Sequence, residues 1–164
     1  HNALEATVAA VASSVKRQPR RFSDLYLETL QRLGEGHDEL RGMLVKHLGN
    51  IGHNPEALPL IVPQLYTALM DRSQRVRAEA ATAYGTLCNK AADDLPTLMH
   101  ESFLVLLLDP YVVVHKAAVE ALREARLPDQ FNRSVINSLW LLILTYANSH
   151  SDDRFLGHCI EEFL

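Results

Sequence analysis

Apolar residues recur along this chain at the three- and four-residue spacing of amphipathic helices, and no stretch shows the strict alternation that is typical of strands. The spacing predicts helices over residues 3–16, 23–33, 38–51, 58–70, 73–91, 93–108, 110–126 and 132–148, with a last one beginning at residue 151 or 152. Asp93 and Asp94 are expected to cap the sixth of these helices, and Pro110 to begin the seventh. Pro63 is expected to kink the fourth helix or to mark its true start. The whole pattern predicts an all-α fold of paired helices.

One segment of the chain repeats itself. Residues 71–87 align with residues 109–125 at a constant offset of 38 without a gap, and with residues 35–51 at an offset of 36. Val76 aligns in this way with Val114 and with Leu40. Self-similarity at a fixed period is typical of arrays whose units cannot bury their apolar faces alone, so that each unit stacks on its neighbours.

The repeated segments share an acidic residue at a turn, an apolar residue and a base five and six positions later, and an alanine-rich helix. The middle copy has Asp71, Val76 and Arg77 at these positions. In these respects the chain resembles the HEAT-repeat family of armadillo-like α-solenoids. The resemblance implies a single domain over residues 1–164, an α-α superhelix of about four antiparallel helix pairs. Its units would span residues 22–52, 56–91, 93–127 and 131–164, after a preceding helix over 3–18.

The turn acids and the bases six positions later form a predicted structural ladder. An acid near a helix N-terminus is favoured by the partial positive charge there, and the base can hydrogen-bond either that acid or the acid of the next unit. The ladder consists of Glu35, Arg41, Asp71, Arg77, Asp109 and His115. His115 replaces the arginine of the other units, which suggests the hypothesis that its joint responds to pH. The alternative is that Arg41 or Arg77 binds an anionic ligand.

The outward face of the second helices is a candidate binding face, because in HEAT-like arrays this face lines a concave groove that grips partners. Its candidate residues are Lys46, Arg75, Thr82, Asn89, Lys116, Glu120 and Arg123. Gly42, Gly49 and Gly85 either give this face a small, uncharged centre or only permit tight packing, and both interpretations stay open. A basic cluster around a loop is a candidate anion-binding site or a solvated turn. It contains Lys16, Arg17, Arg20 and Arg21.

Motifs that carry chemistry are missing from the sequence. It has no glycine-rich phosphate loop, no His-Glu-x-x-His, no Gly-x-Ser-x-Gly and no paired-cysteine zinc spacing, so we expect no enzyme activity, cofactor or metal. The two cysteines, Cys88 and Cys159, are expected to be reduced core thiols. The longest apolar run, 139–144, is too short to cross a membrane, and without a signal peptide the default location is cytoplasmic.

These expectations favour a non-catalytic scaffold that binds another protein. One alternative is a nucleic-acid-binding HEAT-like module, as in some DNA glycosylases, with a basic stripe supplied in part by Arg41, Lys46, Arg75 and Arg77; a pI near 6.1 counts against it. A second is an enzyme-like role resembling the HEAT-containing phycobilin lyases, whose repeats are shorter. The apolar residues Ile160, Phe163 and Leu164 suggest that more of the chain, or a partner, stacks on the C-terminal helix.

Overall fold

A computed structural model describes residues 2–18, 24, 26, 28–30, 32 and 37–148. The regular elements of this part are helices, without strands, which confirms the all-α prediction there. The α-helices are α1 (Asn2–Arg17), α3 (Asp38–Ile51), α4 (Leu58–Leu69), α5 (Gln74–Ala91), α6 (Thr97–Val105), α7 (Val112–Glu124) and α8 (Asn132–Asn148). Short 3-10 helices are η1 (Ala92–Asp94), η2 (Leu106–Leu108) and η3 (Asp129–Phe131). No helix in these ranges combines the length and the apolar character needed to cross a membrane.

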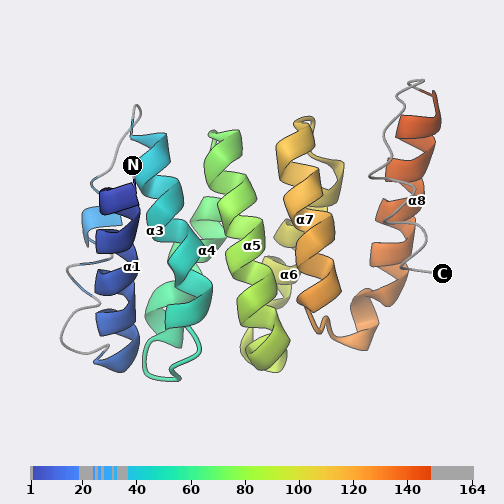
Figure 1. The fold of residues 1–164 in the computed structure, drawn as a ribbon. Helices are drawn as coiled ribbons and strands as arrows, with labels where there is room; N and C mark the ends of the chain where they lie inside the picture. Colours follow the sequence, from blue (N-terminus) through green and yellow to red (C-terminus); the bar gives the residue numbers. More distant parts are fainter. Residues whose placement is uncertain are drawn as a thin grey trace.

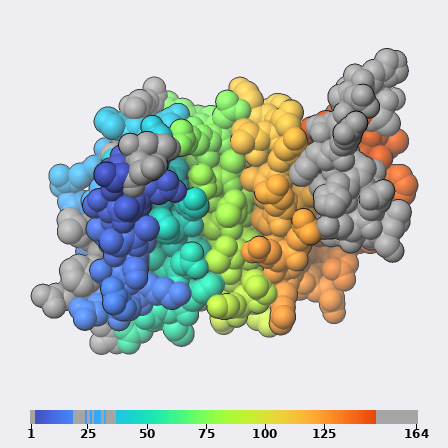
Figure 2. Space-filling view, in the orientation of Figure 1, coloured from blue at the N-terminus to red at the C-terminus, as the bar shows by residue number. Residues whose placement is uncertain are grey.

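The helices lie in two layers (Figure 1). One layer is a row in which α1 contacts α3, α3 contacts α5, and α5 contacts α7. Behind this row lie α4 and α6, which contact each other, and α4 also packs on α5. Figure 2 shows the front of the row as a continuous surface over α1, α3, α5 and α7. At the end of the row α8 follows α7; it packs on α6, η2 and η3, and a hydrogen bond also joins it to α7.

The core fills the space between the two layers. It is formed by one apolar stripe from each helix, with Leu48 of α3, Leu65 of α4 and Leu87 of α5 all fully buried. Tyr84 of α5 stacks on Phe103 of α6 with ring centroids 4.1 Å apart. Burial of this apolar surface, rather than helix propensity alone, stabilises helices of this length.

Two helices near prolines start later than expected, and a third proline lies inside its helix. Asp93 and Asp94 do not cap α6; they lie in η1, and the residue before Pro96 is extended, so α6 starts only at Thr97. Pro110 does not begin α7, because the backbone N–H of Tyr111 donates to the Asp109 carboxylate at 3.0 Å and the helix starts after this turn. Pro63 lies inside α4, which starts at Leu58, so this proline does not mark the start of the helix.

Two glycines allow the helices of the row to approach closely. A Cβ atom at Gly49 of α3 would lie 2.2 Å from the carbonyl oxygen of Ala83 in α5. A Cβ atom at Gly85 of α5 would lie 2.9 Å from the carbonyl oxygen of Ala121 in α7. Both glycines are buried, so they permit tight packing and do not form an open centre on the surface. Gly42 is different, since a Cβ there would meet only side chains, those of Glu79 and Arg75, at ordinary distances of 3.5 Å and more.

Gly49→Ala is expected to lower the free energy of unfolding by about 2 kcal/mol, because the added methyl group collides with backbone and forces α3 from α5. Gly42→Ala is the matched control on the same helix, and it is expected to be neutral or to stabilise by up to about 1 kcal/mol through helix propensity. Urea unfolding followed by circular dichroism measures both variants. An unchanged midpoint for Gly49→Ala would contradict the close contact.

His100 is the most deeply buried histidine of the described residues. Its Nδ1 lies 2.5 Å from the hydroxyl oxygen of Tyr84, and its ring packs against Phe131 with centroids 5.0 Å apart. Burial lowers the pKa of His100 below its ordinary value of 6.5, and hydrogen bonds to the backbone of Ala92 and Leu95 only partly oppose this effect. The neutral ring is therefore the form that the core holds.

Stability should fall as the pH drops below 6.5, since the unfolded chain then takes up a proton at His100 and the folded chain resists it. Above that pH the ring is neutral in both states and contributes no pH dependence. Urea unfolding at pH 7.5 and 5.5 is expected to show a loss about 1 kcal/mol larger in the wild type than in His100→Gln. The other histidines are common to both proteins, so an equal loss would contradict the assignment.

Candidate functional site

Arginine side chains of the row reach across to the acid of the following unit. Arg77 of α5 donates from Nε and Nη2 to both carboxylate oxygens of Asp109, at 2.7 and 3.0 Å. Arg41 of α3 donates to Asp71 at 3.0 Å, and Asp38 lies at the same distance from its guanidinium. Since the Arg77 and Asp109 side chains are only 12% and 7% exposed, this bidentate pair is largely shielded from water.

Arg77 makes further hydrogen bonds besides its pair with Asp109. Arg77 donates from Nη1 to the backbone carbonyls of Asp71 and Arg72, at 2.7 and 3.0 Å. The hydrogen bond to Asp109 raises the pKa of Arg77. The sequence left two acids as possible partners of Arg77. Arg77 pairs with the carboxylate of the later one, Asp109, and contacts the earlier one, Asp71, only through its backbone carbonyl. These contacts occupy the guanidinium group and leave little of it for the alternative, an external anion.

His115 occupies the third position of the ladder. It is buried, its Nδ1 lies 3.2 Å from the backbone oxygen of Asp109, and its Nε2 bonds the hydroxyl of Tyr146 in α8. The carbonyl contact repeats the contact of Arg77 with Asp71, but a phenol replaces the carboxylate. The joint between α7 and α8 is therefore a His–Tyr hydrogen bond instead of an ion pair. Glu35, the first predicted member of the ladder, lies outside the described residues.

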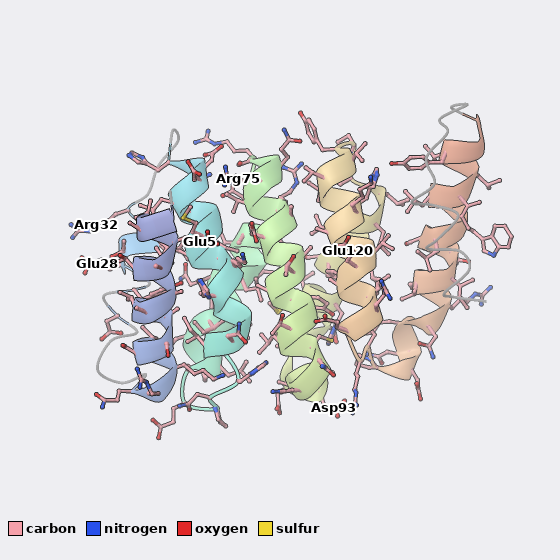
Figure 3. All side chains as sticks on the ribbon, viewed as in Figure 1. Glu5, Glu28, Arg32, Arg75, Asp93 and Glu120 are labelled. Carbon is pink, nitrogen blue, oxygen red and sulfur yellow. The ribbon has the colours of Figure 1, made fainter. Side chains whose placement is uncertain are left out.

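The outward face of α3, α5 and α7 carries several of the candidate binding residues. Lys46, Thr82 and Glu120 occupy equivalent positions of the three helices and are exposed. Arg75, Asn89 and Arg123 are also exposed, whereas Lys116 is half-buried. Figure 3 places Glu5, Arg75 and Glu120 along the row formed by α1, α5 and α7.

Carboxylates of the same face lie against its cations. The Lys46 ammonium lies 3.5 Å from Glu5 of α1, and the Arg75 guanidinium lies 3.3 Å from Glu39 of α3. Glu79 of α5 is half-buried, and burial raises its pKa even though Lys46 and Arg75 act in the opposite direction. This face is consequently polar, with much of its positive charge compensated.

The basic cluster after α1 lies only partly within the described residues. Lys16 and Arg17 are exposed at the end of α1, and Arg17 donates to the backbone oxygen of Ser13 at 3.3 Å. Arg20 and Arg21 fall outside the described residues, as does Cys159. Cys88 is a free, buried thiol.

The acids that compensate this face were not identified from the sequence alone. Glu39 and Arg75 are 36 residues apart, the spacing that places two residues at equivalent positions of neighbouring helices. The opposite charges of Glu39 and Arg75 at this 36-residue spacing could therefore have predicted their ion pair. Glu5 and Tyr146 carry no such signal, because both lie outside the aligned repeats.

No group of three or more histidine, cysteine, aspartate or glutamate side chains in the described ranges is placed to hold a metal ion. Comparisons of the chain with family models, with curated proteins and with solved structures gave no match.

Arg77→Gln is expected to lower the free energy of unfolding by about 3 kcal/mol, because it leaves the buried Asp109 carboxylate without its cation. Arg75→Gln removes a pair whose side chains are about half exposed, so its cost should stay below about 1 kcal/mol. Chemical denaturation of the two variants under identical salt gives the comparison. Equal, small losses would show that the buried rung does not stabilise the stack.

Proposed function

We propose that this chain is a HEAT-like array without catalytic activity, which binds another protein across the outward face of α3, α5 and α7. Repetition of the contacts between helices supports the array. Gly49 meets Ala83 at the α3–α5 interface, and Gly85 and Ala121, which occupy equivalent positions, meet at the α5–α7 interface. The two arginine rungs likewise join equivalent positions, since Arg77 lies 36 residues after Arg41 and Asp109 lies 38 after Asp71.

The choice of a protein partner rests on the carboxylates that lie beside the basic side chains of this face. Duplex binding draws its affinity from cations that neutralise phosphates, so a nucleic-acid face needs basic side chains without acids beside them. The four residues of the candidate basic stripe each have a carboxylate within 3.5 Å. They are Arg41, Lys46, Arg75 and Arg77.

The centre of the proposed face is Thr82, with Lys46 on one side and Glu120 on the other. A helix or extended segment lying across the row would meet a cation first, then a small polar residue, then an anion. Charge complementarity of this kind sets orientation and specificity more than affinity. We therefore expect a polar partner segment with a base over Glu120.

Two arginine substitutions at matched threonines test this face. Thr82 on α5 and Thr67 on α4 are both exposed, and each hydroxyl donates to the carbonyl four residues earlier. Thr82→Arg places a long charged side chain at the centre of the face, whereas Thr67→Arg places it on the other layer. The two variants and the wild type are used as bait in native lysate, with and without nuclease, and retained proteins are identified by mass spectrometry.

The expected result is a discrete protein that wild type and Thr67→Arg retain with or without nuclease, and that Thr82→Arg retains at least about tenfold less. Equal retention by the two variants would place the binding surface elsewhere. Retention that disappears with nuclease would replace the proposal with the nucleic-acid alternative.

A further inference from the structure

Consecutive apolar side chains are exposed where α7 begins. Tyr111, Val112 and Val113 are 49%, 48% and 50% exposed, and we call these residues the α7 patch. Single apolar residues are normal on a protein surface, but an exposed run of them is unfavourable unless it contacts something. Local structure does not account for the run either, because valine is a weaker helix former than most residues.

Comparison with the other units shows that the fold does not need apolar residues at this place. The positions equivalent to Val112 and Val113 are polar or charged at the start of α5 and again at the start of α3. They are Gln74 and Arg75 in α5, and Asp38 and Glu39 in α3. All three helices nevertheless form and pack in the row. The two valines are therefore not required for the stacking of units, which leaves contact with a partner as their role.

The α7 patch lies on the proposed binding face. The helices α3, α5 and α7 start at the same end of the row (Figure 1), and Val113 is equivalent to Arg75, which lies on the row in Figure 3. Val113 and Glu120 are seven residues apart, so they share one side of α7 and are separated by about 10 Å along its axis. A partner that places a base over Glu120 therefore lies within reach of the patch.

Tyr111 is held in place before any partner binds. Its backbone N–H donates to the Asp109 carboxylate at 3.0 Å, and the centroid of its ring lies 5.6 Å from the guanidinium carbon of Arg77. Both of these residues belong to the buried rung between α5 and α7. An apolar surface that is fixed in this way loses little conformational freedom on binding, and tyrosine is enriched at interfaces.

We propose that the α7 patch binds an aliphatic or aromatic side chain of the protein that occupies the outward face. This proposal rests on the proposed function, because it adds an apolar anchor beside the polar segment expected over Thr82. Polar contacts on this face set the orientation of the partner, whereas burial of an apolar side chain against the patch adds affinity. A small patch among polar and charged residues fits one anchor residue of a protein better than a lipid surface, which binds broad apolar faces.

Substitutions at Val112 and Val113 test the anchor. The protein that the wild type retains from native lysate is identified by mass spectrometry and purified, and its Kd is measured by titration calorimetry. Val112→Gln/Val113→Gln makes these positions polar, as they are in α3 and α5. It is expected to raise the Kd at least about tenfold and to make the heat-capacity change of binding less negative. Val112→Leu/Val113→Leu keeps the patch apolar and should stay within about threefold of wild type.

Val105→Gln on α6 is the matched control. Val105 is 67% exposed but lies on a helix of the other layer, so this variant should bind like the wild type. Urea unfolding checks that the variants keep their stability. Equal weakening by Val105→Gln, or by the leucine variant, would overturn the proposal. An unchanged Kd for the glutamine variant, with binding still lost in Thr82→Arg, would overturn the anchor and leave the proposed function standing. If the wild type retains no protein, both proposals fail.

Photo-cross-linking identifies what lies against the patch. The probe is p-benzoylphenylalanine, placed in the bait at position 112 or, as the control, at position 105. After irradiation in native lysate we expect position 112 to cross-link to an apolar residue of the retained protein, and position 105 to give no cross-link to that protein. Cross-links from position 112 that are confined to lipid, or to a second copy of this chain, would overturn the proposal.

Discussion

Close approach of neighbouring helices is the constraint on which the rest of this structure depends. The missing side chains at Gly49 and Gly85 allow α3 to touch the backbone of α5, and α5 to touch the backbone of α7. The distance between helices set by these contacts lets Arg41 and Arg77 reach the acid of the following unit. Packing and hydrogen bonding therefore fix the same arrangement, because each contact needs the spacing that the other provides.

The buried rungs determine what remains available on the outward face. Arg77 is bound to a carboxylate and to two carbonyls, so its charge holds units together and is not offered to a ligand. Nearer the solvent, acids of adjacent helices lie against Lys46 and Arg75. The polar and largely compensated character of this surface is the reason for proposing a protein partner and not a polyanion.

The regular stacking changes at α7. The position equivalent to Gly49 and Gly85 holds Arg123, whose side chain is exposed, and the position equivalent to Arg41 and Arg77 holds His115. Both the glycine contact and the ionic rung are thus replaced, and a His–Tyr bond links α7 to α8. This change accompanies the different placement of α8, on which Ile136, Trp140 and Leu144 are exposed.

The sequence by itself determined the helices of the described part, their approximate ends and the equivalence of positions 36 and 38 residues apart, because apolar spacing and self-similarity are local properties of the chain. The helix predicted over 23–33 is described only at scattered residues, and the one from residue 151 or 152 lies outside the described residues, so both stay predictions. It did not determine that Gly49 and Gly85 lie at contacts between helices instead of on the surface. A glycine has no side chain whose polarity would indicate burial or exposure. It likewise left open whether Arg77 pairs with the acid before it or with the next one. Tertiary structure decided these points, because each depends on the distance between helices, which follows from packing across both layers.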